Sequence, residues 1–183
     1  MSTTINPTAT SRLFRIDAGH SSAEFVVRHL MISKVRGRFS ALQGTIELGP
    51  DSDLPQAVDV AIETASVDTR ESQRDAHLRS ADFFDAETYP AIVYRSTRIE
   101  GTPESFKVYG ELTLHGVTRE VVLDGTFEGA GADPWGGRRA GYSAQTKSDR
   151  KDFGLTWNQA LEAGGIAVGD EVRIELNVEA IRQ

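Results

Sequence analysis

Alternation of apolar and polar residues over long segments is the feature that most constrains the fold of this chain. In the clearest case, residues 172–179, valine, isoleucine and leucine alternate with arginine, glutamate and asparagine. Because successive side chains of a β-strand point to opposite faces, this pattern predicts a strand with one apolar and one charged face. The other segments with this pattern, some of them weaker, are 13–18, 21–27, 42–48, 58–63, 91–98, 106–114, 121–127 and 139–147.

Several of the predicted strands are long, at about 10 residues or roughly 33 Å, where ~5–6 residues is typical. A long strand with a continuous apolar face must pack against a second sheet or close into a barrel. Gly44, Gly110 and Gly125 lie inside predicted strands and favour a sharply bent sheet. We therefore predict an all-β fold, a single antiparallel barrel of about eight strands, whose interior holds side chains or one ligand.

Residues 71–79 are typical of one short helix, and Asp68, three residues before Glu71, predicts a capping box. A second candidate, residues 157–163, stops at two glycines and is interpreted as a helix or only a turn. The segment 115–118 predicts a hairpin between two strands.

The length of 183 residues suits one domain, and no linker or repeat divides the chain. We expect a disordered polar tail over residues 1–12 and one barrel domain over residues 13–182. The tail lacks the basic start and apolar run of a secretory signal, and no stretch approaches the roughly 18 apolar residues of a membrane-spanning helix. These features predict a cytoplasmic protein without an integral membrane segment.

The composition excludes several classes of protein. The absence of cysteine excludes a disulfide scaffold, an iron–sulfur site and a thiol nucleophile. A net charge of −7 argues against a nucleic-acid partner, since such binding depends on neutralising phosphates. The four histidines, at positions 20, 29, 77 and 115, have no metal-ligand spacing, and the nucleophile motif Gly-Xaa-Ser-Xaa-Gly is absent. We therefore predict neither a metal site nor catalytic residues.

A series of motifs over about residues 13 to 182 is similar to the YceI-like family. The resemblance implies a lipocalin-like antiparallel barrel whose interior binds long isoprenoid lipids of the polyprenol or ubiquinone type. The motifs are Asp17-Ala18-Gly19-His20-Ser21, Phe25-Val26-Val27-Arg28-His29, Val35-Arg36-Gly37-Arg38-Phe39 with Gly44, Ser66-Val67-Asp68-Thr69, Arg74-Asp75-Ala76-His77-Leu78, Asp82-Phe83-Phe84, Tyr89-Pro90, Gly110-Glu111-Leu112-Thr113-Leu114-His115-Gly116-Val117-Thr118 and Arg150-Lys151-Asp152-Phe153-Gly154-Leu155.

We therefore expect a protein that is not an enzyme and that binds, sequesters or transports an isoprenoid lipid in an apolar barrel. No cofactor is expected beyond such a bound lipid or quinone, and a homodimer is left open. The residues expected to form the polar rim of the cavity are His20, Arg28 and Arg74. The residues expected to form its lipid-binding wall are Phe25, Val27, Phe39, Val60, Ile62, Tyr94, Val108, Leu112, Phe127, Tyr142, Ile174 and Leu176.

Two alternatives remain open at this point. One is an enzyme acting on an isoprenoid or isoprenoid phosphate lipid, with His20 and either Asp17 or Asp75 transferring protons. The other is an interaction protein whose barrel is filled by its own side chains. The basic clusters around residues 28–38, 70–79 and 147–151 are interpreted either as solvated faces or as a cationic rim that receives an anionic head group.

Overall fold

The computed structural model describes residues 11–183. The tail predicted for residues 1–12 lies outside the described residues except at its end, where Arg12 begins the first strand. Among the described residues, no helix is long and apolar enough to cross a membrane.

The described chain consists of strands, three short 3-10 helices and one α-helix. The α-helix is α1 (Ser72–Arg79), and the 3-10 helices are η1 (Ala18–His20), η2 (Thr64–Ser66) and η3 (Arg150–Phe153). The strands are β1 (Arg12–Ile16), β2 (Ser22–His29), β3 (Ser33–Phe39), β4 (Leu42–Leu48), β5 (Pro55–Glu63), β6 (Val67–Asp68), β7 (Ala91–Thr102), β8 (Ser105–Leu114), β9 (Val117–Ala132), β10 (Arg138–Asp149) and β11 (Val168–Arg182).

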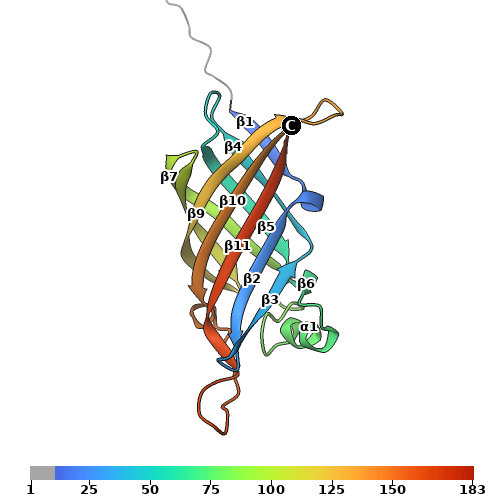
Figure 1. The fold of residues 1–183 in the computed structure, drawn as a ribbon, viewed down its shortest axis with the longest axis vertical. Coiled ribbons are helices and arrows are strands. Elements are labelled where there is room, and N and C mark those ends of the chain that lie inside the picture. The colour runs from blue at the N-terminus through green and yellow to red at the C-terminus, as the bar shows by residue number, and fades with distance from the viewer. Residues whose placement is uncertain (1–10) are drawn as a thin grey trace, which may run out of the picture.

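The strands form a closed antiparallel barrel (Figure 1). Neighbouring strands follow the order β1-β4-β5-β7-β8-β9-β10-β11, and β11 then pairs with β1 to close the ring, with Phe14 opposite Arg182. The other half of β11 pairs with β2, where Val172 lies opposite Val27, and β3 and β6 extend the sheet from there. The predicted all-β barrel of about eight strands with one short helix is confirmed.

Two of the glycines within strands make room for aromatic rings. A Cβ atom at Gly110 would lie 2.5 Å from Cζ of Tyr94, and one at Gly125 would lie 2.3 Å from Cε2 of Phe106. Since real Cβ atoms do not approach other carbons this closely, each ring lies across its neighbouring strand only because that strand carries glycine there. These glycines therefore let bulky rings pack flat against the inside of the barrel.

Helix α1 begins differently from the sequence prediction. Glu71 is its N-cap residue, and its carboxylate accepts hydrogen bonds from the backbone N–H groups of Gln73 at 3.1 Å and Arg74 at 2.6 Å. Asp68 instead accepts from the backbone N–H of Arg70 at 2.9 Å, so the predicted capping box is wrong. Residues 157–163 form a loop and not a helix.

The predicted hairpin between β8 and β9 is present. Leu114 pairs with Val117, and the two turn residues, His115 and Gly116, have φ angles of 53° and 72°. Two positive φ values match the tight hairpin turn whose twist suits antiparallel strands.

The end of the barrel near β1 is closed by packed side chains. Phe14, Leu48, Ala140 and Ala180 are at most 1% exposed there and belong to one apolar cluster. These four side chains close that end of the barrel, which we call the closed end.

Candidate functional site

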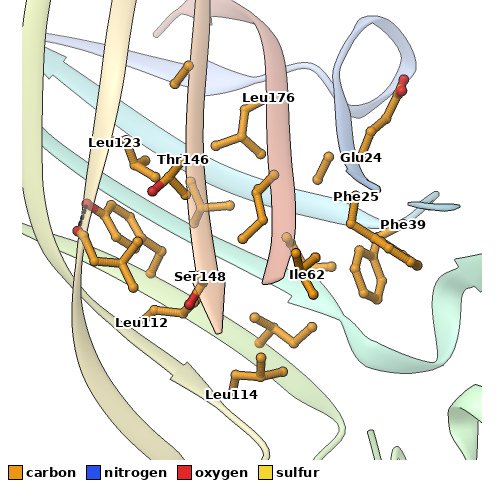
Figure 2. A pocket seen from close by; sticks show the side chains of 18 of the residues that line it. Glu24, Phe25, Phe39, Ile62, Leu112, Leu114, Leu123, Thr146, Ser148 and Leu176 are labelled. Carbon is orange, nitrogen blue, oxygen red and sulfur yellow. Dashed lines mark hydrogen bonds between the residues drawn. The ribbon is translucent and has the colours of Figure 1, made fainter. Parts of the chain in front are cut away.

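The barrel encloses an elongated cavity with a volume of about 250 Å³. Aliphatic and aromatic side chains from strands around the barrel form nearly all of its surface, as Figure 2 shows. Those on β11 run from Val168 to Val178, ten residue steps or roughly 33 Å at the usual strand rise. The cavity therefore follows much of the length of the barrel.

The structure places most of the predicted wall residues on this cavity. Phe127 is the exception, because its ring packs on Tyr142 at a centroid distance of 5.4 Å and does not line the cavity. The predicted residues that line the cavity are Phe25, Val27, Phe39, Val60, Ile62, Tyr94, Val108, Leu112, Tyr142, Ile174 and Leu176.

Sequence reasoning missed a group of wall residues in α1 and just after it. Leu78, from α1, and Phe83 and Phe84, which follow it, line the cavity outside the barrel strands. Phe84 meets the ring of Phe39 edge-on at a centroid distance of 5.6 Å. The signal that could have identified them is the Asp82-Phe83-Phe84 motif directly after the predicted helix.

Some wall residues beside α1 retain exposed surface. At the deep end, Val108 and Phe106 are 3% and 5% exposed. Near α1, Ile62, Leu78 and Phe84 line the same cavity but are only partly buried. The wall beside α1 is therefore partly accessible, as are Val58 and Val178 nearer β1.

The two tyrosine hydroxyls of the wall are occupied by the protein itself. Tyr94 donates to the backbone carbonyls of Val108 at 3.0 Å and Val121 at 3.1 Å, and Tyr142 donates to the carbonyl of Asp53 at 2.9 Å. Burial raises the pKa of both tyrosines, so both hydroxyls remain protonated donors. Both hydroxyls are thus engaged in hydrogen bonds to the backbone.

Arg150 lies in the wall at the end of β10, with its side chain 4% exposed. Its guanidinium donates to the carbonyls of Leu155 at 2.5 Å, Trp157 at 2.9 Å and Gly169 at 2.8 Å. Burial lowers the pKa of Arg150, and the carboxylate of Asp170 opposes this shift. The guanidinium thus holds the loop between β10 and β11 in place.

The residues predicted for a polar rim lie outside the cavity. Arg74 donates to Oγ1 of Thr69 at 2.7 Å and to its carbonyl at 2.9 Å, which ties α1 to the end of β6. Arg28 lies near the tip of the β2–β3 hairpin and His20 lies in η1. None of the three lines the cavity.

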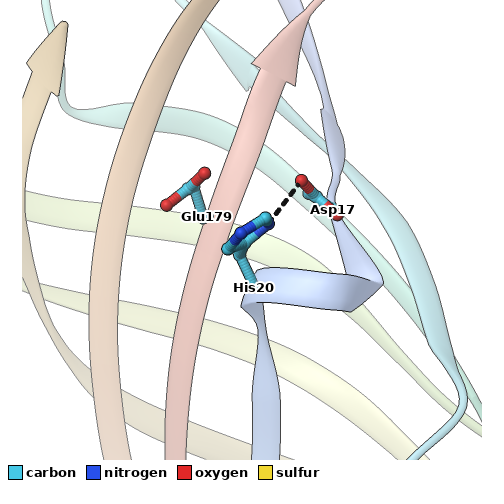
Figure 3. Close-up of side chains that lie close together, drawn as sticks. All are labelled: Asp17, His20 and Glu179. Atoms are coloured by element: carbon cyan, nitrogen blue, oxygen red, sulfur yellow. Dashed lines mark hydrogen bonds and ion pairs between the residues drawn. The ribbon is translucent and has the colours of Figure 1, made fainter. Parts of the chain in front are cut away.

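His20 instead belongs to a charged cluster outside the cavity (Figure 3). Its Nδ1 lies 2.9 Å from Oδ2 of Asp17, and ligand atoms of Asp17, His20 and Glu179 lie within 4.8 Å of one another. Arg139 donates to both carboxylates, at 2.8 Å to Asp17, and this contact is the main reason that the pKa of Asp17 falls to about 2. A cation thus already bridges the carboxylates, and a metal ion would have to displace it.

The proton-transfer groups considered for an enzyme are not brought together at the cavity. Asp75 is buried, and its carboxylate accepts hydrogen bonds from N and Oγ1 of Thr69 at 2.8 and 2.6 Å. It therefore anchors α1, whereas Asp17 accepts from Arg139 and contacts His20 outside the cavity.

The comparisons with known proteins agree with this geometry. A model of the YceI-like domain matches residues 14–180. A UPF0312 protein of Vibrio cholerae is 39% identical over 166 residues, which cover 90% of this chain and 83% of that protein.

Two solved structures share the fold. The YceI protein of Campylobacter jejuni superimposes with a TM-score of 0.74 at 32% identity, covering 85% of this chain and 90% of that one. A polyisoprenoid-binding domain from Saccharophagus degradans superimposes with a TM-score of 0.68 at 17% identity, covering 93% of this chain and 98% of that one.

Proposed function

Because the chain belongs to the YceI-like family, we propose that it binds the chain of a long isoprenoid lipid inside the barrel and catalyses no reaction on it. The observation that carries this proposal is the elongated apolar cavity. Removing apolar lipid surface from water contributes roughly 25 cal/mol per Å² to the binding free energy. The cost of ordering the lipid chain is subtracted from this gain. The barrel would thereby sequester or transport the lipid.

The shape of the cavity favours a chain over a compact ligand. Its apolar wall follows β11 from Val168 to Val178, roughly 33 Å of strand, which suits an extended apolar chain. The similar fold of the polyisoprenoid-binding domain from Saccharophagus degradans supports an isoprenoid as this chain. A barrel filled by its own side chains would leave no such space, so the cavity argues against a purely structural interior.

The polar groups of the wall favour a neutral head group. Figure 2 shows the hydroxyls of Thr146 and Ser148, both on β10, among the aliphatic side chains. The Thr146 hydroxyl makes only a 3.5 Å contact with a backbone carbonyl, which is too long for a good hydrogen bond. Arg150 is the wall residue with a cationic group, and its donors are occupied by backbone carbonyls. An alcohol or quinone oxygen therefore fits this wall better than a phosphate.

Mass spectrometry of an organic extract of the purified protein tests the proposal. We expect a polyprenol or an isoprenoid quinone in the extract. Lipid-free protein should then bind an added polyprenol or ubiquinone more tightly than a polyprenyl phosphate. An extract without isoprenoids, together with no binding of any added isoprenoid, would contradict the proposal.

Variants of the wall test where the lipid lies. Leu112→Lys places a charge in the apolar wall and should abolish lipid binding. Ala144→Phe should also block binding by filling the cavity with an apolar ring, and it keeps the test valid if the lysine variant does not fold. Leu13→Lys is the matched control, since Leu13 is 45% exposed and does not line the cavity. Equal binding by Ala144→Phe and by the wild type would place the lipid elsewhere.

A further inference from the structure

The tip of the β2–β3 hairpin presents three consecutive large apolar residues to solvent. Leu30, Met31 and Ile32 are 37%, 50% and 84% exposed. Single exposed apolar residues are common on protein surfaces, whereas three together at a protruding tip suggest a contact surface. We call these three residues the tip.

Backbone conformation does not explain the choice of these residues. Leu30 and Met31 have φ angles of 49° and 62°, in the left-handed region where glycine and asparagine are favoured. Bulky side chains are unfavourable in that region and also unfavourable in water. The tip is therefore better explained by a function than by the stability of the hairpin.

Basic residues flank the tip on both strands. Arg28 lies directly opposite Lys34 in the antiparallel register, and Arg36 follows on the same face of β3. Like charges directly opposite each other destabilise a strand pair. Within residues 11–183, the ion pair of this region joins Arg38 to Asp68, and Arg28, Lys34 and Arg36 have no acidic partner. The tip is thus surrounded by uncompensated positive charge on a protein whose net charge is −7.

The tip lies at the end of the barrel where the cavity wall also ends. The backbone N–H of Leu30 donates to the carbonyl of Ala167 at 2.8 Å, so the tip is held beside the loop between β10 and β11 (Figure 1). Residues 156–167 of that loop contain a single charged residue, Glu162. Val27 is three residues before Leu30, and Val168 directly follows Ala167. Both valines line the cavity.

We propose that the tip docks this end of the barrel on an anionic lipid bilayer. Leu30, Met31 and Ile32 enter the head-group region, while Arg28, Lys34 and Arg36 contact lipid phosphates. Apolar side chains flanked by basic ones are suited to this interface, because burial and charge attraction add together. The proposal rests on the proposed lipid-binding function, since docking brings the cavity to the membrane that supplies or receives the lipid.

Flotation with vesicles tests the docking. The wild-type protein should float with vesicles of equal parts phosphatidylcholine and phosphatidylglycerol, should bind pure phosphatidylcholine weakly, and should dissociate as salt rises. Lys34→Gln with Arg36→Gln should reduce binding to the anionic vesicles by about five-fold per charge removed. Ile32→Ser should reduce it by about ten-fold or more, because Ile32 is the most exposed residue of the tip.

Matched controls lie on the β9–β10 loop and at the start of β10, at the other end of the barrel (Figure 1). Trp135→Ser removes an apolar side chain that is 82% exposed, and Arg138→Gln removes an exposed positive charge. Both controls should bind vesicles as the wild type does. Equal losses in tip and control variants, or no binding of the wild type to anionic vesicles, would overturn the proposal. The proposal would also be overturned if the wild type were a dimer that does not bind vesicles and Ile32→Ser were a monomer. The tip would then join two copies of the chain.

Mass spectrometry of lipid extracted from the same purified variants distinguishes a failure of membrane docking from a failure of lipid binding. Protein with Ile32→Ser should retain its bound isoprenoid, because Ile32 does not line the cavity. Loss of docking with the lipid retained supports the docking surface. Unchanged docking by the tip variants, with the lipid still bound, refutes the docking surface and leaves the lipid-binding function intact.

Discussion

Replacing Arg150 with methionine should lower the free energy of unfolding by about 3 kcal/mol. Arg150 donates three hydrogen bonds of 2.5 to 2.9 Å, two to loop carbonyls of Leu155 and Trp157 and one to Gly169 in β11. It also makes longer contacts to Val168 and Asp170. A hydrogen bond made by a charged group contributes about 1.5–3 kcal/mol, so the three short ones amount to roughly 5–9 kcal/mol. Removing the buried charge also removes a burial cost of several kcal/mol, which leaves the smaller net loss.

The assay has a global and a local readout. Urea unfolding followed by far-ultraviolet circular dichroism gives the free energy, and hydrogen exchange of residues 155–168 reports on the loop itself. Exchange in this loop should accelerate in Arg150→Met, because the carbonyls of Leu155, Trp157 and Gly169 lose their shared donor. Since Leu155 and Val168 line the cavity, retention of bound lipid should fall as well.

Lys151→Met is the matched control. Lys151 contacts the same Asp170, at 2.8 Å, but its side chain is 47% exposed, and exposed ion pairs contribute about 0–1 kcal/mol. If Arg150→Met costs no more than this control and loop exchange is unchanged, the assignment of Arg150 as the anchor of the loop is refuted.

Three further predictions concern the barrel and its closed end. Tyr94→Phe should lower the free energy of unfolding by about 1–3 kcal/mol in urea unfolding, because the buried carbonyls of Val108 and Val121 lose the single O–H donor that they share. Gly110→Ala should cost about 1–3 kcal/mol in the same assay, since its Cβ would lie 2.5 Å from the Tyr94 ring. Asp17 has a folded pKa of about 2, below its ordinary value of 3.8, so its contribution to stability is present above about pH 4 and lost as the pH falls toward 2. The stability difference between the wild type and Asp17→Asn should therefore shrink over that range, and a constant difference would refute the role of the Arg139 contact.

The strands and their inward faces could be predicted from the sequence, because period-2 alternation is a local property of the chain. Val108, Leu112, Ile174 and Leu176 were identified as inward-facing in this way and line the cavity. The prediction that Phe127 lines the cavity is wrong, since the inward-facing positions of β9 continue beyond the cavity. Periodicity gives the face of a residue but not its depth along the barrel.

The partners of the charged residues depended on tertiary structure. Arg139 contacts Asp17, which is 122 residues away, and His20 contacts the same carboxylate and does not line the cavity. Arg150 belongs to a basic cluster in the sequence, yet its guanidinium is buried and its donors go to carbonyls of a loop. No local pattern distinguishes such a buried anchor from a solvated arginine.

The sequence by itself determined an antiparallel barrel with an apolar interior, because alternation and long strands leave few other ways to bury one face of every strand. Only the tertiary structure decided where the cavity begins and ends. That depends on the pairing of β1 with β11, which brings Phe14 and Ala180 together at the closed end, and on Phe84 beside α1. These contacts join residues far apart in the chain, so the room left for a ligand follows from how the ring closes.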